Sequence, residues 1–188
     1  MDSVPILKRT RIILRQARDS DIDDRLSCGR HAEIVRMYGG DTRDLKPFNR
    51  DEAASWYQNC MKAQPGWVIE HSGHCIGNAR LTVTESDKRA RYAIGIFNVQ
   101  KLGIGLGTEA TNLVLCYAFE TLGLHRVELC VLEYNKRAIK CYQKCGFVQE
   151  GLEREDALVE GRWETDVRMS ILEREYRTLY RPQGTSIG

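Results

Sequence analysis

Three glycines at alternate positions separate a series of short strands from the longest predicted helix in the second half of the sequence. The segment VQKLGIGLGTEA places Gly103, Gly105 and Gly107 after a predicted strand, and Thr108 is expected to open the helix. Glycine permits a left-handed backbone and lets a ligand approach the main chain closely. The N–H groups of such a loop and of a helix N-terminus together bind phosphate oxygens. The segment therefore predicts a pyrophosphate-binding turn.

Two other phosphate-binding motifs do not fit this segment. A dinucleotide-binding unit requires the spacing GxGxxG, and a P-loop requires Gly-Lys followed by Ser or Thr. The three glycines do not have the first spacing, and Gly107-Thr108 lacks the lysine of the second. A flexible turn without a ligand remains the alternative when the segment is considered alone.

The order of the predicted elements indicates one domain of mixed α/β or α+β type, covering residues 1–188. Strands are expected at 11–16, 67–71, 75–84, 92–97, 126–132, 147–152 and 163–172. Helices are expected at 20–37, 49–63, 108–122 and 135–144, with a disordered tail at 181–188.

Composition excludes several classes of protein. The 28 Lys and Arg residues nearly balance 26 Asp and Glu, and a net charge of +2 argues against a broad nucleic-acid surface. No apolar run reaches the roughly 20 residues that span a bilayer, and Lys8, Arg9 and Arg11 interrupt the N-terminus, so neither a membrane anchor nor a secretory signal is expected. Seven cysteines without disulfide or CxxC spacing indicate reduced thiols in a cytoplasm and no metal site.

A second informative segment is NKRAIKCYQKCGF, at 135–147. Asn135 is a good N-cap, and Gly146 ends the helix that follows. Ala138, Ile139 and Tyr142 fall three and four residues apart, on one face of that helix. Core packing explains the spacing, but it does not explain why a phenol lies on the apolar face.

In this order, the two segments resemble the GCN5-related N-acetyltransferases, the GNAT superfamily. The resemblance extends from strand 11–16 to Leu172 and is closest over 94–147, where GTEA, YAFETLGLHRVEL and NKRAIKCYQKCGF follow one another. It is similar to the branch that contains ribosomal-protein-alanine and polyamine N-acetyltransferases. The resemblance implies a central mixed, mostly antiparallel and splayed sheet of about seven strands, with helices on both faces.

The resemblance also implies a set of site residues and acetyl-coenzyme A as the cosubstrate, without a metal. Main-chain groups of the glycine segment would hold the pyrophosphate, namely Gly103, Ile104, Gly105, Leu106, Gly107 and Thr108. Asn135 would contact the pantetheine arm, and a main-chain N–H of strand 94–97, at Ile96, would hold the thioester oxygen. Tyr142 would be the general acid. Such folds also commonly form homodimers.

The sequence departs from the family pattern at two positions. Leu102 stands where the family loop usually begins with Arg or Gln, and Ala93 stands where many relatives carry a Glu before the loop. Without that Glu, the general base is open among Glu70, Glu85, Glu128, Glu133 and water.

The pKa values of amines favour one class of acceptor but do not identify the acceptor. An α-amine, with a pKa of about 7.7–8.0, is neutral roughly one time in ten at pH 7, and a lysine side chain only about once in 2,500. A missing base therefore favours a protein N-terminal α-amine, acetylated by direct attack. A polyamine, an aminoglycoside and a non-catalytic acetyl-CoA-binding module are the alternatives, and a Cys141 nucleophile would need a depressed thiol pKa. Carboxylates of 20–64, expected to form the acceptor pocket, could attract a cationic amine: Asp21, Asp23, Asp24, Glu33, Asp41, Asp44, Asp51 and Glu52.

Overall fold

The computed structural model describes residues 4–63 and 65–180, which fold around one sheet. Its eight strands lie in the order β1-β2-β3-β4-β5-β6-β8-β7. They are β1 Leu7–Lys8, β2 Ile13–Arg15, β3 Gly66–His71, β4 His74–Thr84, β5 Arg89–Ile96, β6 Arg126–Leu132, β7 Val148–Val159 and β8 Arg162–Leu172. All neighbouring strands are antiparallel except β5 and β6. The predicted mixed, mostly antiparallel sheet is confirmed, and β1 is an additional strand.

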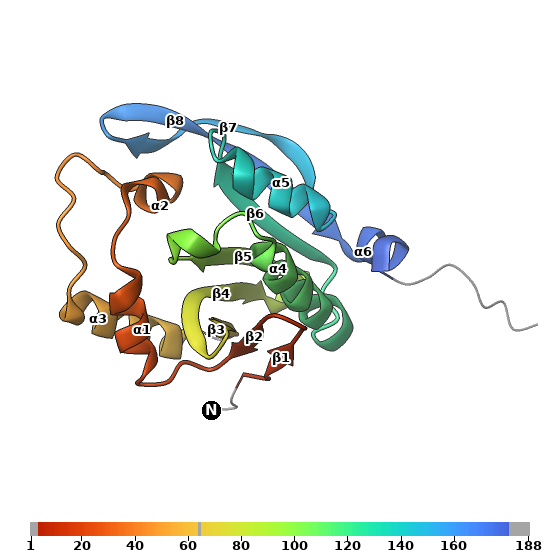
Figure 1. Ribbon diagram of the computed structural model, residues 1–188. Helices are drawn as coiled ribbons and strands as arrows, with labels where there is room; N and C mark the ends of the chain where they lie inside the picture. Colours follow the sequence, from red (N-terminus) through yellow and green to blue (C-terminus); the bar gives the residue numbers. More distant parts are fainter. Residues whose placement is uncertain (1–3, 64, 181–188) are drawn as a thin grey trace, which may run out of the picture.

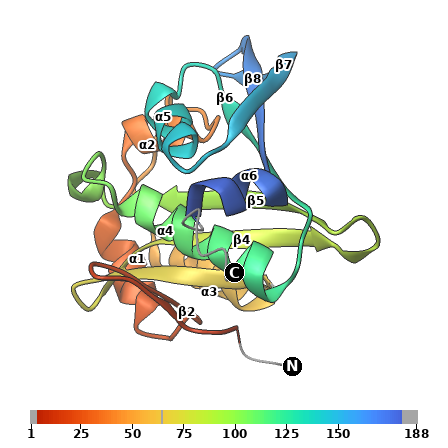
Figure 2. The same ribbon diagram turned by 90° about the vertical axis from the view of Figure 1, so that its right-hand side faces the viewer.

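Helices cover both faces of the sheet, as predicted. They are α1 Asp21–Cys28, α2 Ala32–Met37, α3 Arg50–Lys62, α4 Leu106–Cys116, α5 Lys136–Lys144 and α6 Glu173–Tyr180. Figure 1 shows α1, α2 and α3 on the left of the strands, with α4 and α6 on the right. After a 90° turn, α4 and α6 lie in front of the sheet and α1 and α3 behind it (Figure 2). We call these two sides the α4 face and the α3 face.

The single helix expected over 20–37 is wrong, because two helices occupy this stretch. Gly29, with φ +66°, ends α1, and its N–H bonds to the carbonyl of Leu26. His31 is extended and precedes α2. The helix predicted at 49–63 is confirmed as α3, and Asn49 and Glu52 form a reciprocal capping box at its start.

The helix after the glycines begins two residues earlier than predicted, at Leu106. Gly105 is its N-cap with φ +91°, and the first helical bond runs from the Glu109 N–H to the Gly105 carbonyl, 3.1 Å. A π-helical turn, Tyr117–Thr121, continues α4.

The C-terminal elements extend beyond the predicted ones. β7 runs to Val159 instead of residue 152, with register shifts against β8. Helix α6 was not predicted: Tyr176 is buried and stacks on Phe119 and Tyr180, with ring centroids 4.9 Å apart in each pair. The predicted disordered tail, 181–188, lies outside the described residues.

The sheet splits between β5 and β6. The two strands pair only at Arg89↔Arg126, Ala90↔Val127 and Arg91↔Glu128, whereas each remains paired with its other neighbour along its length. Residues 92–96 and 129–132 therefore border an opening in the sheet, which confirms the predicted splay. The side of β5 that faces this opening has main-chain groups that no neighbouring strand uses.

Candidate active site

A cavity of about 800 Å³ follows the split between β5 and β6. The lining comes from the glycine segment, α2, α4, α5 and strands β4, β5, β6 and β8. Most of the predicted site residues line it: Ile96, Gly103, Gly105, Gly107, Thr108, Asn135 and Tyr142. Two do not, since the Ile104 side chain is 47% exposed to solvent and Leu106 lies in the core. For those two positions only the main chain could serve a ligand.

The glycine segment presents main-chain donors at one end of the cavity. Gly103 and Gly105 have φ of +77° and +91°, a region that disfavours other residues. The N–H groups of Leu106, Gly107 and Thr108 precede the first helical bond and have no partner in the helix. This geometry suits an anion.

Arg11, just before β2, hydrogen-bonds to the glycine segment and to α4. Its Nη1 donates to the Ile104 carbonyl at 2.9 Å, and its Nε donates to Glu109 Oε1 at 2.6 Å. The guanidinium therefore ties the loop to the first turn of α4. No pattern in the sequence indicates these two contacts, because Arg11 is 93 positions before Ile104 and 98 positions before Glu109.

Positive side chains surround the same end of the cavity. Lys101, Arg137, Lys140 and Lys144 all line it. Arg137 pairs with Glu33 at 2.6 Å, whereas within residues 4–63 and 65–180 the three lysines form no ion pair. Lysines free to face the cavity attract a negatively charged ligand.

Tyr142 lies on the cavity wall with its ring packed in the core. The ring is 8% exposed and contacts Tyr92 and Phe147, at centroid distances of 6.4 and 5.7 Å. Burial raises the pKa of the Tyr142 hydroxyl above its ordinary value. The phenol therefore stays protonated at neutral pH, as a proton donor must.

Tyr38, at the end of α2, is a site residue that the sequence did not reveal. Its hydroxyl donates to the Ile94 carbonyl at 3.1 Å, on the edge of β5 that borders the split. Tyr38 as a whole is 55% exposed. Desolvation of its hydroxyl raises the pKa of Tyr38, and the main-chain N–H of Ile96 acts in the opposite direction. Tyr38 therefore lies beside the strand segment that the family resemblance assigns to the thioester.

Asn135 caps α5, as predicted. Its Oδ1 accepts from the Ala138 N–H at 3.2 Å, and its Nδ2 donates to the Met37 carbonyl at 3.2 Å. The side chain therefore links α5 to the end of α2 across the cavity wall. A ligand contact by the Asn135 amide would have to share or replace the bond to Met37.

None of the four glutamates considered as a general base lines the cavity. Glu70 pairs with Arg15 and Arg18, Glu128 with Arg126 at 3.0 Å, and Glu133 with Lys136 at 3.9 Å. Glu85 lies in a 3-10 turn after β4. Asp166, on β8, is the acidic residue that does line the cavity, and its Oδ1 is buried without a hydrogen-bond partner among the described residues.

Cys141 also faces the cavity. Its Sγ lies 3.3 Å from Thr108 Oγ1. A hydrogen bond with the Cys145 thiol, and others from threonine hydroxyls, lower the pKa of Cys141. A Cβ on Gly107 would lie 3.6 Å from this sulfur, so the thiol belongs to the glycine-segment end of the cavity.

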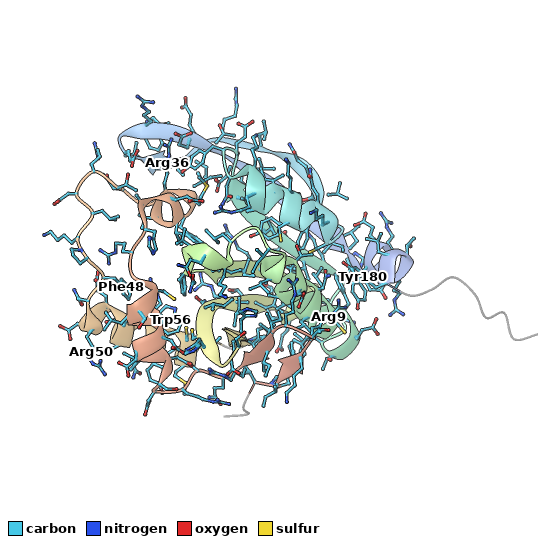
Figure 3. The ribbon with its side chains drawn as sticks, in the orientation of Figure 1. Arg9, Arg36, Phe48, Arg50, Trp56 and Tyr180 are labelled. Atoms are coloured by element: carbon cyan, nitrogen blue, oxygen red, sulfur yellow. The ribbon has the colours of Figure 1, made fainter. Side chains whose placement is uncertain are left out.

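A second hollow, of about 440 Å³, lies where the acceptor pocket was expected, between α1, α3 and the end of β5. The Arg25 guanidinium lies between the rings of Phe48 and Phe97, at 3.8 and 4.2 Å from their centroids. Figure 3 labels Phe48 and Trp56 on this side of the molecule. Of the eight carboxylates of residues 20–64, five pair with arginines: Asp21, Asp23, Glu33, Asp41 and Glu52. Asp24 lies 3.0 Å from the Nδ1 atom of His74.

Residues 4–63 and 65–180 contain neither a candidate membrane span nor a candidate metal site. No helix there has the length and apolar character needed to cross a bilayer. The His, Cys, Asp and Glu side chains of these residues form no group of three or more that could hold a metal ion.

Comparison with known proteins gives relatives in sequence. Spermidine N(1)-acetyltransferase of Escherichia coli K12 is 30% identical over 122 residues, 64% of this chain and 65% of that enzyme. YdaF of Bacillus subtilis, provisionally named a ribosomal N-acetyltransferase, is 35% identical over 74 residues, 39% and 40% of the two chains. The chain thus spans just under two thirds of the length of the spermidine enzyme, and less of YdaF.

Solved structures extend the similarity over most of the fold. A GCN5-related N-acetyltransferase from Brucella melitensis superposes with a TM-score of 0.80 at 19% identity, covering 95% of this chain and 83% of that one. Spermidine N-acetyltransferase from Vibrio cholerae, in complex with CoA and spermine, superposes with a TM-score of 0.73 at 25% identity, covering 89% and 99%. Residues 11–148 match the family model described as an acetyltransferase (GNAT) domain. The chain therefore belongs to the GNAT acetyltransferase family.

Proposed function

We propose that this protein is an acetyl-CoA-dependent N-acetyltransferase of the cytoplasm whose acceptor is a protein N-terminal α-amine. One observation carries the proposal: a single cavity joins the glycine segment, the free edge of β5 and the Tyr142 side chain. A donor with a diphosphate at one end and a thioester at the other needs all three features.

The residues present fit such a donor. The main-chain donors of 103–108 and the helix N-terminus would hold the diphosphate, and Lys101, Lys140 and Lys144 add positive charge beside it. The arm would follow the free edge of β5, where the Ile96 N–H would hold the thioester oxygen.

The reaction is direct attack of the amine on the thioester. The neutral amine forms a C–N bond with the acetyl carbon, and the C–S bond then breaks. The leaving thiolate, whose conjugate acid has a pKa of about 8.5, takes a proton from the Tyr142 hydroxyl. The attacking nitrogen loses one proton to solvent, and the Tyr142 phenolate takes one proton from solvent, which restores the phenol.

The choice of an α-amine rests on charge. Each of the eight carboxylates of 20–64 lies outside the lining of the large cavity, whereas a polyamine with several ammonium groups would need several anions near its path. Similarity to YdaF supports a protein acceptor. A polyamine is the second candidate, favoured by similarity to the spermidine acetyltransferases.

Release of free coenzyme A tests the proposal. The purified chain is mixed with acetyl-CoA and one amine at a time: peptides with free N-termini, the same peptides blocked at the N-terminus, spermidine, spermine and an aminoglycoside. We expect thiol release with the free peptides only, and a mass gain of one acetyl group at their N-termini. Transfer to spermidine alone would establish the second candidate. Saturable acetyl-CoA binding without transfer to any amine would show a binding module and overturn the proposal.

A further inference from the structure

The carboxylate of Asp166 could accept a proton or bind a cation, and the reaction proposed above gives it no role. Asp166 lies on β8 directly opposite Leu132 of β6, and its carboxylate lines the cavity. Its Oδ1 is buried and accepts no hydrogen bond from any described residue. A buried carboxylate oxygen without a partner is costly, so a donor supplied by a bound molecule would account for its place in the fold.

The register of the strands assigns Asp166 to the α3 face. Tyr92 hydrogen-bonds to Thr111 of α4, so Ala90 and Tyr92 point to the α4 face and Arg91 to the other. Ala90 pairs with Val127, so the Val127 side chain also points to the α4 face. Side chains alternate along a strand, so Cys130 and Leu132 point to the α3 face. Asp166, opposite Leu132, shares that face. The cavity thus runs from the glycine segment on one face to Asp166 on the other.

Two arginines and a hydroxyl lie at the same end of the cavity. Arg80, Thr82 and Arg91 line it, and Thr82 pairs directly with Arg91 across β4 and β5. Within the described ranges neither arginine forms an ion pair. In the cavity lining, Asp166 is the one carboxylate at this end, with two guanidinium groups, and this combination suits an acceptor with a single ammonium group followed by carbonyl or carboxylate oxygens. A peptide N-terminus has this pattern.

We propose that the Asp166 carboxylate binds the ammonium group of the acceptor and accepts one proton from it. This inference rests on the proposed function. Asp166 Oδ1 accepts one proton from the R–NH₃⁺ group, and the resulting amine attacks the acetyl carbon. The protonated Asp166 then releases its proton to solvent at the α3-face end, while Tyr142 serves the sulfur.

The surroundings of Asp166 suit a base. Burial raises the pKa of its carboxyl group, and the negative charges of Asp156 and Glu153 on β7 raise it further, against the lowering effect of Arg91 on β5. Strand β6 contributes Leu132 opposite and the Cys130 thiol, which donates to Glu153. A carboxyl pKa shifted toward that of an α-amine makes proton transfer between the two groups easier.

Asp166→Asn tests the inference, with Glu164→Gln as the matched control. Glu164 is two residues earlier on β8 and does not line the cavity. With an N-terminal peptide at pH 7, we expect Asp166→Asn to lower kcat/KM at least about 100-fold, the lower range for acid–base catalysis. Binding of acetyl-CoA, measured by calorimetry, should be unchanged, and Glu164→Gln should behave as the parent protein.

The pH profile separates a base from a structural residue. In the parent protein, kcat/KM should level off above the Asp166 pKa. In Asp166→Asn it should rise about tenfold per pH unit up to the amine pKa, about 7.7–8.0. Because a raised carboxyl pKa means that the charged form costs stability above that pKa, Asp166→Asn should not lower the melting temperature at pH 7.

Each outcome has a separate meaning. An active parent protein with an unchanged rate and pH profile in Asp166→Asn would overturn the role of Asp166 and leave the proposed function standing. A loss of rate accompanied by weaker acetyl-CoA binding or a lower melting temperature would also overturn it, in favour of a structural role. A parent protein that acetylates no amine would refute the proposed function itself.

Discussion

The two ends of the cavity are built in different ways. The end at the glycine segment is formed by short stretches of contiguous sequence, 103–108 and 135–144, with positive charge supplied by residues of the same stretches. The end on the α3 face is formed by single residues of three strands: Arg80 on β4, Arg91 on β5 and Asp166 on β8. The first end is local in the sequence, and the second exists only once the sheet is assembled.

This difference suggests that one end of the cavity binds the donor and the other end binds the acceptor. A contiguous loop and helix start can hold one fixed ligand part, such as the proposed diphosphate. Isolated strand residues can change one at a time without disturbing the core, since they point away from it. We therefore expect variants at the glycine-segment end to change donor affinity, and variants at the α3-face end to change acceptor use.

Tyr142→Phe should have the largest effect, because the phenol lies between the two ends. Removing the hydroxyl should lower kcat about 10²–10⁴-fold, the usual contribution of general acid catalysis, while the acetyl-CoA dissociation constant stays constant. Steady-state thiol release and calorimetry measure the two quantities. Tyr38→Phe is the comparison variant, since Tyr38 also lines the cavity and its hydroxyl lies on the free edge of β5. A loss on Tyr38→Phe alone would transfer the acid role to Tyr38.

Reversing the charge of Lys140 or Lys144 should weaken acetyl-CoA binding about tenfold, or about 1.4 kcal/mol. The effect should shrink as salt is added, because exposed charges are screened. Calorimetry at two salt concentrations measures it, with Lys136→Glu as the control. Lys136 is on the same helix but lies outside the cavity lining and pairs with Glu133. An equal effect in the control would mean that net charge alone, without a defined site, attracts the donor.

Arg80→Gln and Arg91→Gln should change acceptor use only a few-fold. Each removes an exposed charge, worth up to about 1 kcal/mol, so KM for an N-terminal peptide should rise about three- to fivefold. Relative use of spermidine should increase, since less positive charge opposes it. Competition between the two amines in one reaction mixture measures the ratio. A changed acetyl-CoA dissociation constant would contradict the division between the two ends.

Cys141→Ser should have almost no effect on turnover, within about twofold, because direct attack needs no acyl-enzyme. The thiol should nevertheless be reactive. Because the pKa of Cys141 is lowered, more of it is thiolate at neutral pH than in an ordinary cysteine, so alkylation by iodoacetamide should rise with pH and level off earlier than for an ordinary thiol. Acetyl-CoA should protect the thiol. Trapping of a labelled acetyl group on Cys141 would instead support a two-step transfer.

The local half of this site could be predicted from the sequence, and the reason is its short range. Gly105, Asn135 and Tyr142 each lie within one turn or one helix, so glycine spacing, capping and helical periodicity indicated their positions on these elements. Their roles in the site came from the family resemblance and stay predictions. The strands of the sheet were found in the same way, by composition and turn signals. The boundary errors lie where tertiary contacts extend an element, as with α6, which packs Tyr176 on Phe119.

The rest could not be predicted because it depends on contacts between distant residues. Tyr38 reaches Ile94, and Arg11 reaches Ile104, only after the sheet and α4 have assembled. The four glutamates considered as bases lie in predicted strands and turns. The sequence alone does not indicate which side of the sheet each of them faces. Asp166 was missed for the same reason, since its place depends on the register of β6 against β8.

The hydrogen bond from Tyr38 to the Ile94 carbonyl has a consequence for turnover. A donor arm that uses this strand edge must exchange one hydrogen bond for another, and such an exchange yields little net free energy. The reacting end of the donor is then held weakly, and most of the affinity resides in the phosphates. With acetyl-CoA as the proposed donor, product coenzyme A would detach at its sulfur end first, and a truncated donor such as acetyl-pantetheine should lose nearly all affinity while keeping its reactivity at saturation.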